Sequence, residues 1–446
     1  MKAVFASFLI FLAALAIRVG FAWDYIRHFP KQALSTIPFL FESGNIAHSL
    51  ATGGGFGSPF HVITGPTAWM TPLYPMLLAG IMRLFGPYTF GSYIAAVAFN
   101  IVASSLACVP LYFAAARIGG VRLAILSAAL WAIFPNAILL TFQSLWDTSL
   151  SAFLGASLLW ATLKVAESKR ESAWLAYGLL WGIALMTNAS FLSLLPFLML
   201  WAAWQLRSSC NFGLSSRNLL LAAAVVFLCC VPWTIRNYRV FHTLVPLRSV
   251  LGLQLWVGNN PQAKVEWLGE QHPIHDTAER EKYISMGEIA YMEQKRRAAV
   301  SYIFSHPGHE ATLIGGRFIA LWTGGSLSPW HDFLATRSAW FRYVLVFNIA
   351  TALAALLGIV VLFRDTVSGA ARFAIPVSAY AIIFPCAYYM TLALPRYRSP
   401  IDPVIMLLTA VALTAAWARF TSSKPSLQNA RPTKGSQPSP AGRRAR

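Results

Sequence analysis

Long apolar runs separated by short polar segments fill most of this chain. Many of the runs approach the roughly 20 apolar residues that an α-helix needs to cross a bilayer. We predict about ten membrane-spanning helices, with boundaries accurate to a few residues. They lie near residues 3–22, 91–116, 122–141, 148–164, 172–188, 190–206, 218–235, 341–363, 372–393 and 401–418. The pattern therefore predicts an all-α polytopic membrane protein.

Two polar segments between the predicted spans are long, 23–90 and 236–340. In the first, ESGNIAHSLAT at 42–52 predicts an amphipathic helix that stops at the glycine run GGGFG. The following PLYPMLLAGIMRLFG is an apolar stretch of about 15 residues, which is short for a span, so we expect a helix lying in the membrane interface. If this helix instead crossed the membrane as an additional span, the orientation of everything after it would invert.

The second long segment contains residues 264–310, which mix acidic and basic side chains with helical periodicity over EIAYMEQKRRAAVSYIF. We predict a small helical cap there, too short to have a large core of its own. Residues 1–418 then form one transmembrane domain, with 23–90 as its first outer loop and 236–340 as its outer cap. Residues 419–446 are rich in Ser, Pro and Arg, which predicts a disordered basic tail.

Basic residues mark one side of the predicted membrane. The short loops between alternate spans carry Arg117, Arg122, Lys164, Lys169, Arg170, Arg207, Arg217, Arg364 and Arg372. These loops fall on the same side as Lys2, so the positive-inside rule places both termini in the cytoplasm. The first run is too long for a signal peptide and lacks a small-residue cleavage site, which predicts an uncleaved span. We therefore expect a multi-pass protein of the cell (inner) membrane whose two long polar segments face the extracytoplasmic side.

Composition and charge agree with this class. The chain is 57% hydrophobic and 11% charged, with a mean hydropathy of +0.56. Its net charge of +19 would suggest a nucleic-acid partner in a soluble protein. Here the positive-inside bias and anionic lipid headgroups account for the charge, so we predict the lipid bilayer as a partner and no nucleic acid. The five cysteines fall mostly in apolar runs without metal or disulfide spacing, which indicates packing roles.

Acidic residues are scarce in the first third of the chain. Only Asp24, Glu42 and Asp147 precede Glu167, and all three are predicted on the outer side. Carboxylates near a bilayer are costly and tend to mark function. Glu42 is a candidate general base, with a helix N-terminal carboxylate as the alternative. Asp147 is a candidate supporting acid or an N-cap, whereas Asp24 is more typical of an interfacial residue.

Four arginines form a second signal on the same side. PWTIRNYRVF places Arg236 and Arg239 at the outer end of a predicted span, and LPRYRSP places Arg396 and Arg398 likewise. Their charge runs against the orientation bias. Arginine forks bind phosphate oxygens bidentately, so we predict a lipid phosphate as their ligand, with headgroup snorkelling as the alternative.

Weaker signals come from asparagine and histidine. Asn259 and Asn260 in the GNNP turn could bind sugar or acceptor hydroxyls, or could be purely structural. His272 and His275 in HPIHD are a conceivable metal pair without a second cluster. The metal therefore stays unknown: no cofactor is required by the sequence, and a divalent metal is left open.

Four passages carry a resemblance to a known family. They are FESGNIAHSLATGGGFGSPF followed by PTAWMTPLYPMLLAGIMRLFG; PWTIRNYRVFHTLVPLRSVLGLQLWVGNNP; HPIHDTAEREKYISMGEIAYMEQKRRAAVSYIFSHP; and LPRYRSPIDPVIMLL. Their order and topology resemble the GT-C membrane glycosyltransferases. The most similar branch is bacterial family 39, with relatives among the protein O-mannosyltransferases and the lipid A aminoarabinose transferases.

This resemblance implies transfer of a sugar, with inversion, from a polyprenyl-phosphate donor to an unknown acceptor on the extracytoplasmic face. The absence of a glycine-rich nucleotide loop is compatible with a lipid-linked donor. The family usually has an Asp or an Asp-Glu pair just before the amphipathic helix, where this chain has Pro38 and Phe39. Glu42 is displaced from that position by about one helical turn, whereas Asp147 occupies the place of the relatives' second acid.

Two other classes stay open on the sequence. A flippase or transporter of a lipid-linked glycan should show internal repeats and charged spans, and neither is evident. A surface polysaccharide polymerase or ligase would share the donor, and the long acidic first loop favours the transferase.

Overall fold

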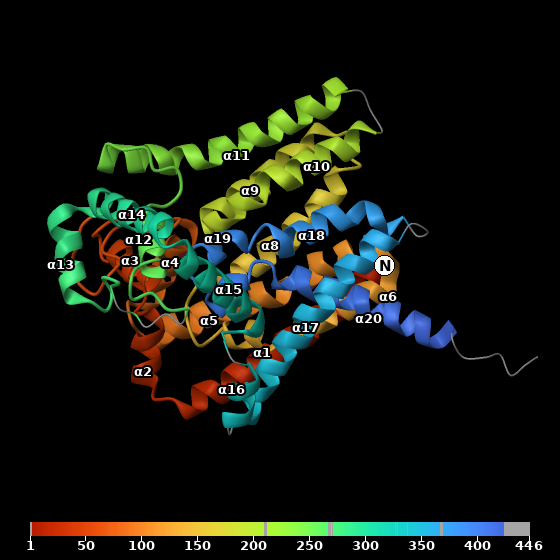
Figure 1. Cartoon of the computed structure of the whole chain (residues 1–446), viewed down its shortest axis with the longest axis horizontal. Coiled ribbons are helices and arrows are strands. Elements are labelled where there is room, and N and C mark those ends of the chain that lie inside the picture. Colours follow the sequence, from red (N-terminus) through yellow and green to blue (C-terminus); the bar gives the residue numbers. More distant parts are fainter. Residues whose placement is uncertain are drawn as a thin grey trace, which may run out of the picture.

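The computed structural model describes residues 2–208, 212–265, 269, 271–325, 327, 329–336, 338–365 and 369–422. Helices make up nearly all of the regular structure in these ranges, and the β-type pairing found there is one isolated antiparallel bridge between Gly57 and Pro66. The long helices run side by side as a bundle (Figure 1). The prediction of an all-α protein is therefore confirmed.

The bundle helices are α1 (Lys2–His28), α5 (Phe90–Leu106), α6 (Cys108–Ala132), α7 (Pro135–Leu139), α8 (Thr148–Val165), α9 (Glu171–Thr187), α10 (Leu195–Arg207), α11 (Phe212–Phe241), α17 (Ala339–Arg364), α18 (Ala374–Ile382), α19 (Cys386–Tyr389) and α20 (Asp402–Ser422). The first outer loop forms α2 (Lys31–Thr36), α3 (Glu42–Ala51) and α4 (Leu73–Phe85). The outer cap forms α12 (Leu251–Gly258), α13 (Thr277–Met286), α14 (Glu288–Ser305), α15 (Pro307–Thr323) and α16 (Pro329–Ala335). Short 3-10 turns are η1 (Ile37–Phe39), η2 (Ala189–Ser193), η3 (Ala370–Phe373) and η4 (Pro395–Arg398).

In the described part of the chain, seven helical segments are long and apolar enough to cross a membrane. One of them, Phe90–Ala132, is a hairpin, because non-helical dihedral angles at Gly119 and Gly120 interrupt it. The indole nitrogen of Trp131 donates a hydrogen bond to the Ser104 carbonyl across this hairpin. With the hairpin counted twice, the seven correspond to eight of the ten predicted spans; α9, with 17 residues, and α10 are shorter than a full span, and their crossing of the membrane stays a prediction. Helix α10 has only 13 residues, because η2 precedes it.

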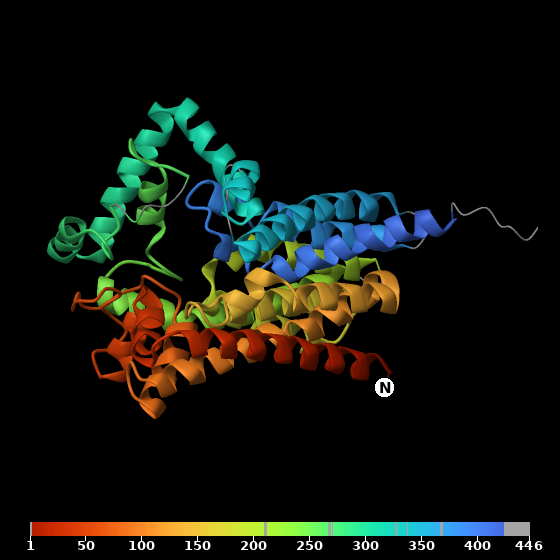
Figure 2. The same cartoon turned by 90° about the horizontal axis from the view of Figure 1, so that it is seen from below.

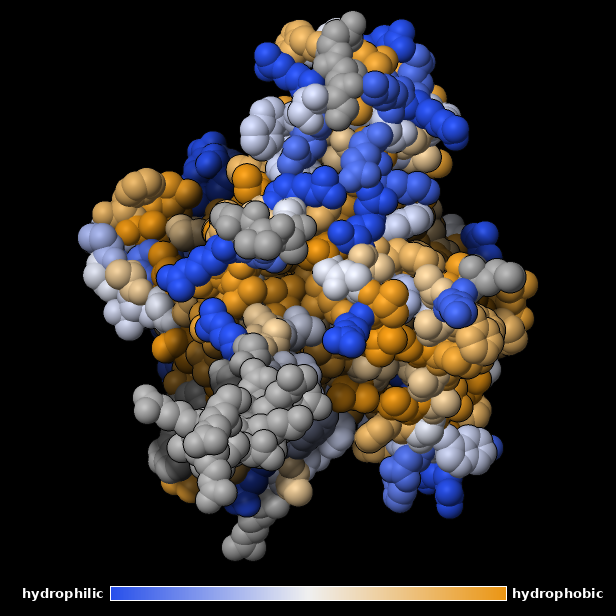
Figure 3. All heavy atoms as spheres, turned by 90° about the vertical axis from the view of Figure 1, so that its right-hand side faces the viewer, coloured by the Kyte–Doolittle hydropathy of each residue, from blue (hydrophilic) through white to orange (hydrophobic). Residues whose placement is uncertain are grey.

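The two ends of the bundle differ in content. The N-terminus and the end of α20 lie at one end, and helices α3 and α4 and the cap helices α12 to α14 gather at the other, which is called the outer end after its predicted orientation (Figures 1 and 2). Seen from the terminal end, hydrophilic side chains are interspersed with a largely hydrophobic surface (Figure 3). The start of α1 and the end of α20 therefore lie at the same end of the bundle, and the cytoplasmic placement of both termini stays a prediction. Of the predicted tail 419–446, residues 419–422 belong to α20 and the rest lie outside the described residues.

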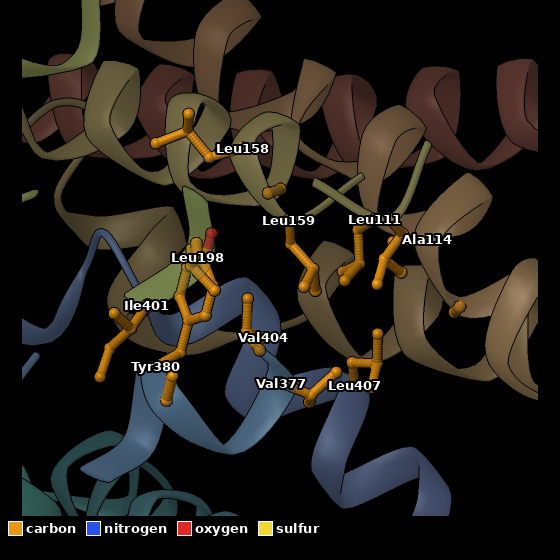
Figure 4. Close-up of a cluster of buried hydrophobic side chains, with 14 of the residues drawn as sticks. Leu111, Ala114, Leu158, Leu159, Leu198, Val377, Tyr380, Ile401, Val404 and Leu407 are labelled. Carbon is orange, nitrogen blue, oxygen red and sulfur yellow. The ribbon is translucent and has the colours of Figure 1, made fainter. Parts of the chain in front are cut away.

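The core lies where helices from both halves of the chain meet. Leu111, Leu158, Leu198, Val377 and Leu407 pack together from α6, α8, α10, α18 and α20 (Figure 4). Glycines allow close approach at two points: a Cβ on Gly155 would stand 1.9 Å from the Pro400 carbonyl oxygen, and one on Gly358 would stand 2.0 Å from that of Leu408. Such small residues suit helix packing in a bilayer, where hydrophobic burial gives little driving force.

Helix α4 corresponds to the apolar stretch predicted to lie in the interface. It has 13 residues, too few to cross roughly 30 Å of hydrocarbon at about 1.5 Å per residue. Tyr74, Leu78 and Met82 form a buried stripe on one side, while Leu84 is 81% exposed. The length and the one-sided burial argue against an additional span and place α4 beside α3 at the outer end.

Candidate active site

A cavity of about 120 Å³ opens at the outer end of the bundle. Its walls come from the first outer loop, the start of α8, the segment before α12, the cap and η4. The polar and charged residues of the lining are Glu42, Thr71, Asp147, Thr148, Thr187, Asn188, Arg248, Gln254, His272 and Arg396, and the aromatic ones are Trp69, Trp146, Tyr388 and Tyr397. Two carboxylates and two guanidinium groups, distant in sequence, thus share one cavity.

Glu42 is the first residue of α3, following Phe41 in an extended conformation. The helix is fixed by its next two residues: the Ser43 hydroxyl donates to the Leu145 carbonyl at 2.9 Å, and Gly44 lies against Phe39, whose carbonyl oxygen would be 2.0 Å from an added Cβ. Because Leu145 leads directly into Trp146 and Asp147, this contact brings Glu42 to the start of α8. The offset from the family's usual position therefore still places a carboxylate in the cavity.

Burial raises the pKa of Glu42, and its own backbone N–H and the charge of Arg396 oppose that rise. Burial lowers the pKa of the adjacent His272 to about 3, so its imidazole is neutral near pH 7. The Nδ1 atom of His272 accepts a hydrogen bond from the Ile274 N–H, which puts the ring proton on Nε2, 3.6 Å from Oε1 of Glu42. A neutral N–H donor therefore faces the candidate base.

Asp147 precedes α8, but its side chain makes no capping hydrogen bond. Asp147 thus stands at the N-cap position of α8, as the alternative predicts, but its carboxylate does not cap the helix. Its Oδ2 instead accepts hydrogen bonds from the Ser151 hydroxyl at 2.8 Å and from Nδ2 of Asn188 at 2.9 Å. Burial raises its pKa, and these two hydrogen bonds and the charge of Arg248 act in the opposite direction. Two side chains thus hold Asp147 by one oxygen.

The two cavity arginines have few internal partners. Arg396 lies with its guanidinium carbon 4.1 Å from the centre of the Trp146 ring and 5.3 Å from that of Tyr397. Among the described residues its N–H groups have no hydrogen-bond acceptor. Arg248 makes one long hydrogen bond, 3.5 Å to Oε1 of Gln254. Both guanidinium groups can therefore donate to a ligand.

The other predicted arginines lie outside the cavity. Arg236 donates to the carbonyls of Thr67 and Phe56, each at 2.6 Å, and Arg239 is exposed. Arg398 is 1% exposed and pairs through Nε with Oδ1 of Asp402 at 2.5 Å. Their donors are directed at the protein or at the surface, so the structure does not bring these three residues to the cavity.

The predicted asparagines also serve internal contacts. Nδ2 of Asn259 donates to the carbonyls of Leu255 and Met390, and its Oδ1 accepts from Arg317. Asn260 bonds within its own turn, and neither residue lines the cavity. Asn259 thus fixes the end of α12 against α15 and the end of α19, and Asn260 stabilises the turn that follows α12.

Sequence reasoning missed Arg248, Asn188 and Gln254. Arg248 lies in the segment 236–340, on the predicted outer side, so the charge argument applied to the other arginines would have found it. Asn188 and Gln254 carry no comparable signal, because their roles depend on which neighbours the fold supplies. Among the described residues, no three His, Cys, Asp or Glu side chains gather as a metal-binding group.

Comparisons with known proteins agree with this architecture. Residues 69–235 match the sequence model of the dolichyl-phosphate-mannose-protein mannosyltransferase family. The structure resembles the oligosaccharyltransferase AglB from Archaeoglobus fulgidus, solved with an inhibitory peptide and a dolichol-phosphate, at 13% identity and a TM-score of 0.57 over 98% of this chain and 52% of AglB. The arrangement of helices therefore resembles the fold of this membrane oligosaccharyltransferase.

A second structure of the Archaeoglobus fulgidus oligosaccharyltransferase, with Zn and sulfate, has 14% identity and a TM-score of 0.52, covering 93% of this chain and 50% of that one. The present chain thus spans about half the length of these proteins. ArnT from Cupriavidus metallidurans has 17% identity over 88% of this chain and 75% of its own, but a TM-score of 0.34, which adds nothing to the fold assignment. No curated protein matches significantly. The resemblance to family 39 in particular stays a prediction.

Proposed function

We propose that this chain transfers a sugar from a polyprenyl-phosphate donor to an acceptor hydroxyl or phosphate on the extracytoplasmic side of the membrane, with inversion. One observation carries the proposal: Glu42, Asp147, Arg248 and Arg396 line a single cavity at the outer end of a GT-C bundle. A base, a supporting acid and two phosphate-binding cations are the groups that such a transfer needs. The family match and the dolichol-phosphate in the AglB complex support a lipid-phosphate donor.

In the proposed step Glu42 is the general base. Its carboxylate takes the proton of the acceptor hydroxyl as that oxygen attacks the anomeric carbon of the sugar. The new bond forms on the face opposite the phosphate, the carbon–oxygen bond to the phosphate breaks, and the polyprenyl phosphate leaves with the electron pair. A carboxylate whose pKa is raised by burial is a stronger base than an exposed one.

Arg396 and Arg248 neutralise the leaving phosphate. Guanidinium groups bind phosphate oxygens through paired N–H donors, and these two have donors to spare. The negative charge on the phosphate grows as the bond to the sugar breaks, so cations already in place stabilise the transition state more than the ground state. Asp147, held by Oδ2, accepts a sugar or acceptor hydroxyl through Oδ1.

The test is transfer by the purified protein in detergent or lipid nanodiscs. A labelled polyprenyl-phosphate sugar is supplied with envelope lipid, glycan and protein acceptors, and labelled product and released polyprenyl phosphate are measured together. We expect Glu42→Gln to lower transfer by about 10²–10⁴-fold while the protein stays folded, because the amide cannot take a proton. Asp24→Asn is the matched control, since Asp24 is an exposed carboxylate in the same outer loop.

Three outcomes would contradict the proposal. Wild-type transfer by Glu42→Gln would exclude this residue as the base. Movement of intact donor across a membrane without release of polyprenyl phosphate would instead favour a flippase, and chain growth on a lipid-linked glycan would favour a polymerase.

A further inference from the structure

A buried carboxylate outside the cavity connects three parts of the outer end. Glu288, the first residue of α14, is 5% exposed. Its Oε1 accepts from the Ala68 N–H at 2.8 Å and from the Ser249 hydroxyl at 2.6 Å. Its Oε2 accepts from the Tyr283 hydroxyl at 2.6 Å and from the Thr67 hydroxyl. Four donors match the roughly four acceptor positions of a carboxylate.

Two of these contacts are adjacent in sequence to cavity residues. Ala68 precedes Trp69, and Ser249 follows Arg248, both of which line the cavity. The Ser249 N–H also donates to the Ala68 carbonyl at 2.9 Å, so the two segments meet directly. The same carboxylate therefore binds the first outer loop and the Arg248 segment, which are far apart along the chain.

Arg236 holds the first outer loop from the other side. Its two terminal nitrogens donate to the carbonyls of Thr67 and Phe56, which flank the antiparallel bridge between Gly57 and Pro66 inside that loop. Thr67 is thus fixed through its backbone by α11 and through its hydroxyl by α14. Arg236, which the sequence predicts to bind a phosphate, thus belongs to this hydrogen-bond network. The network reaches Ser249, the residue next to Arg248.

We propose that Glu288 is a positioning residue for the donor phosphate: it sets the Arg248 segment against the first outer loop, so that the Arg248 guanidinium stays in the cavity wall. This role rests on the proposed function, because it takes the ligand of Arg248 to be a phosphate. Glutamine at this position has one acceptor oxygen and one NH₂ donor in place of two acceptor oxygens. At least one of the four donors then loses its acceptor, so the hold of this side chain on the two segments weakens, while the Ser249 N–H bond to the Ala68 carbonyl remains.

Steady-state kinetics give the first readout. We expect Glu288→Gln to raise the KM for the polyprenyl-phosphate sugar about tenfold or more, with kcat changed by less than about threefold, because hydrogen bonds to a charged group are lost at the positioning step. A merely structural role would lower the amount of active enzyme at unchanged KM. Glu281→Gln, an exposed carboxylate on α13, is the matched control and should behave as wild type. Ser249→Ala should raise the KM for the donor less than Glu288→Gln does, and the double variant should have nearly the same KM as Glu288→Gln alone.

Limited trypsin digestion gives a second readout that needs no substrate. The bond after Arg248 ends in the Ser249 N–H that donates to Ala68, so it should resist cleavage in the wild type and open faster in Glu288→Gln. Cleavage after the exposed Arg239 serves as the internal reference. If the wild type transfers no lipid-linked sugar, the proposed function is wrong. Digestion still shows in that case whether Glu288 holds the Arg248 segment against the first outer loop. Unchanged KM in Glu288→Gln, with or without faster cleavage, overturns the positioning role.

Discussion

Two arginine pairs that look alike in sequence have different surroundings in the structure. Arg236 and Arg239, three residues apart, end α11, and Arg396 and Arg398, two residues apart, lie in η4, each pair at the outer end of a span. In each pair one guanidinium is occupied by acceptors of the protein itself. The second member faces the surface in the α11 pair and the cavity in the η4 pair.

Free donors, and not charge alone, therefore distinguish a ligand-binding arginine from a structural one. Arg398 directs its N–H groups to Asp402, Asn348 and two backbone carbonyls. Arg396 stacks on Trp146, a contact that uses the face of the guanidinium and leaves its N–H edge available. Substitutions in the two pairs should therefore separate stability from donor binding.

The largest expected effect is on stability, at Arg398. Replacing it with leucine leaves the carboxylate of Asp402, 1% exposed, without its partner. Breaking a buried ion pair from one side costs about 3–5 kcal/mol. We expect Arg398→Leu to lower the thermal unfolding midpoint in detergent or to prevent folded expression. Adding Asp402→Leu should recover part of the loss, and a fully stable single variant would contradict the structural role.

Arg396→Gln should have the next largest effect, and on donor binding. A hydrogen bond to a charged group contributes about 1.5–3 kcal/mol, so we expect the KM for the lipid donor to rise about 10- to 100-fold. Because Arg396 has no acceptor among the described residues, the thermal midpoint should stay close to that of wild type. Arg396→Lys should recover only part of the affinity, since lysine lacks the paired donors. Wild-type donor binding by Arg396→Gln would remove this residue from the phosphate site.

The fold was largely predictable from the sequence, because the spans follow from the length of apolar runs. The hairpin between α5 and α7 is an example: the Gly119–Gly120 pair and flanking arginines separate two runs that a hydropathy criterion alone merges. Span ends were less predictable. The predicted span 190–206 begins late, at Leu195, because η2 turns the chain first.

The site was predictable only in part. Glu42 and Asp147 stood out because carboxylates are rare in the first third of the chain, and Arg396 because it opposes the orientation bias. The same bias could not separate Arg396 from Arg398, since the acceptors of Arg398 come from the fold. The internal role of Asn259 could not be predicted for the same reason, because its partner Arg317 lies far along the chain.

A smaller effect is expected on the pH dependence of kcat/KM. The charge of Arg396 lowers the pKa of Glu42 against the rise caused by burial. Removing that charge in Arg396→Gln raises the pKa of Glu42 further. A general base works ionised, so kcat/KM rises as pH passes upward through this pKa. We expect the acid limb of the kcat/KM profile to move to higher pH in Arg396→Gln. An acid limb at the same pH as in the wild type would mean that the charge of Arg396 does not influence the ionisation of Glu42.

The smallest expected effect is at Arg239, the exposed member of the α11 pair. Surface substitutions away from special contacts usually change stability by no more than about 0.5 kcal/mol. We expect Arg239→Gln to match wild type in thermal midpoint, in donor KM and in the acid limb of its pH profile. It removes the same charge as Arg396→Gln at a similar depth in the predicted topology. An increase in donor KM as large as that of Arg396→Gln would mean that outer-side charge in general, and not the free guanidinium in the cavity, attracts the lipid phosphate.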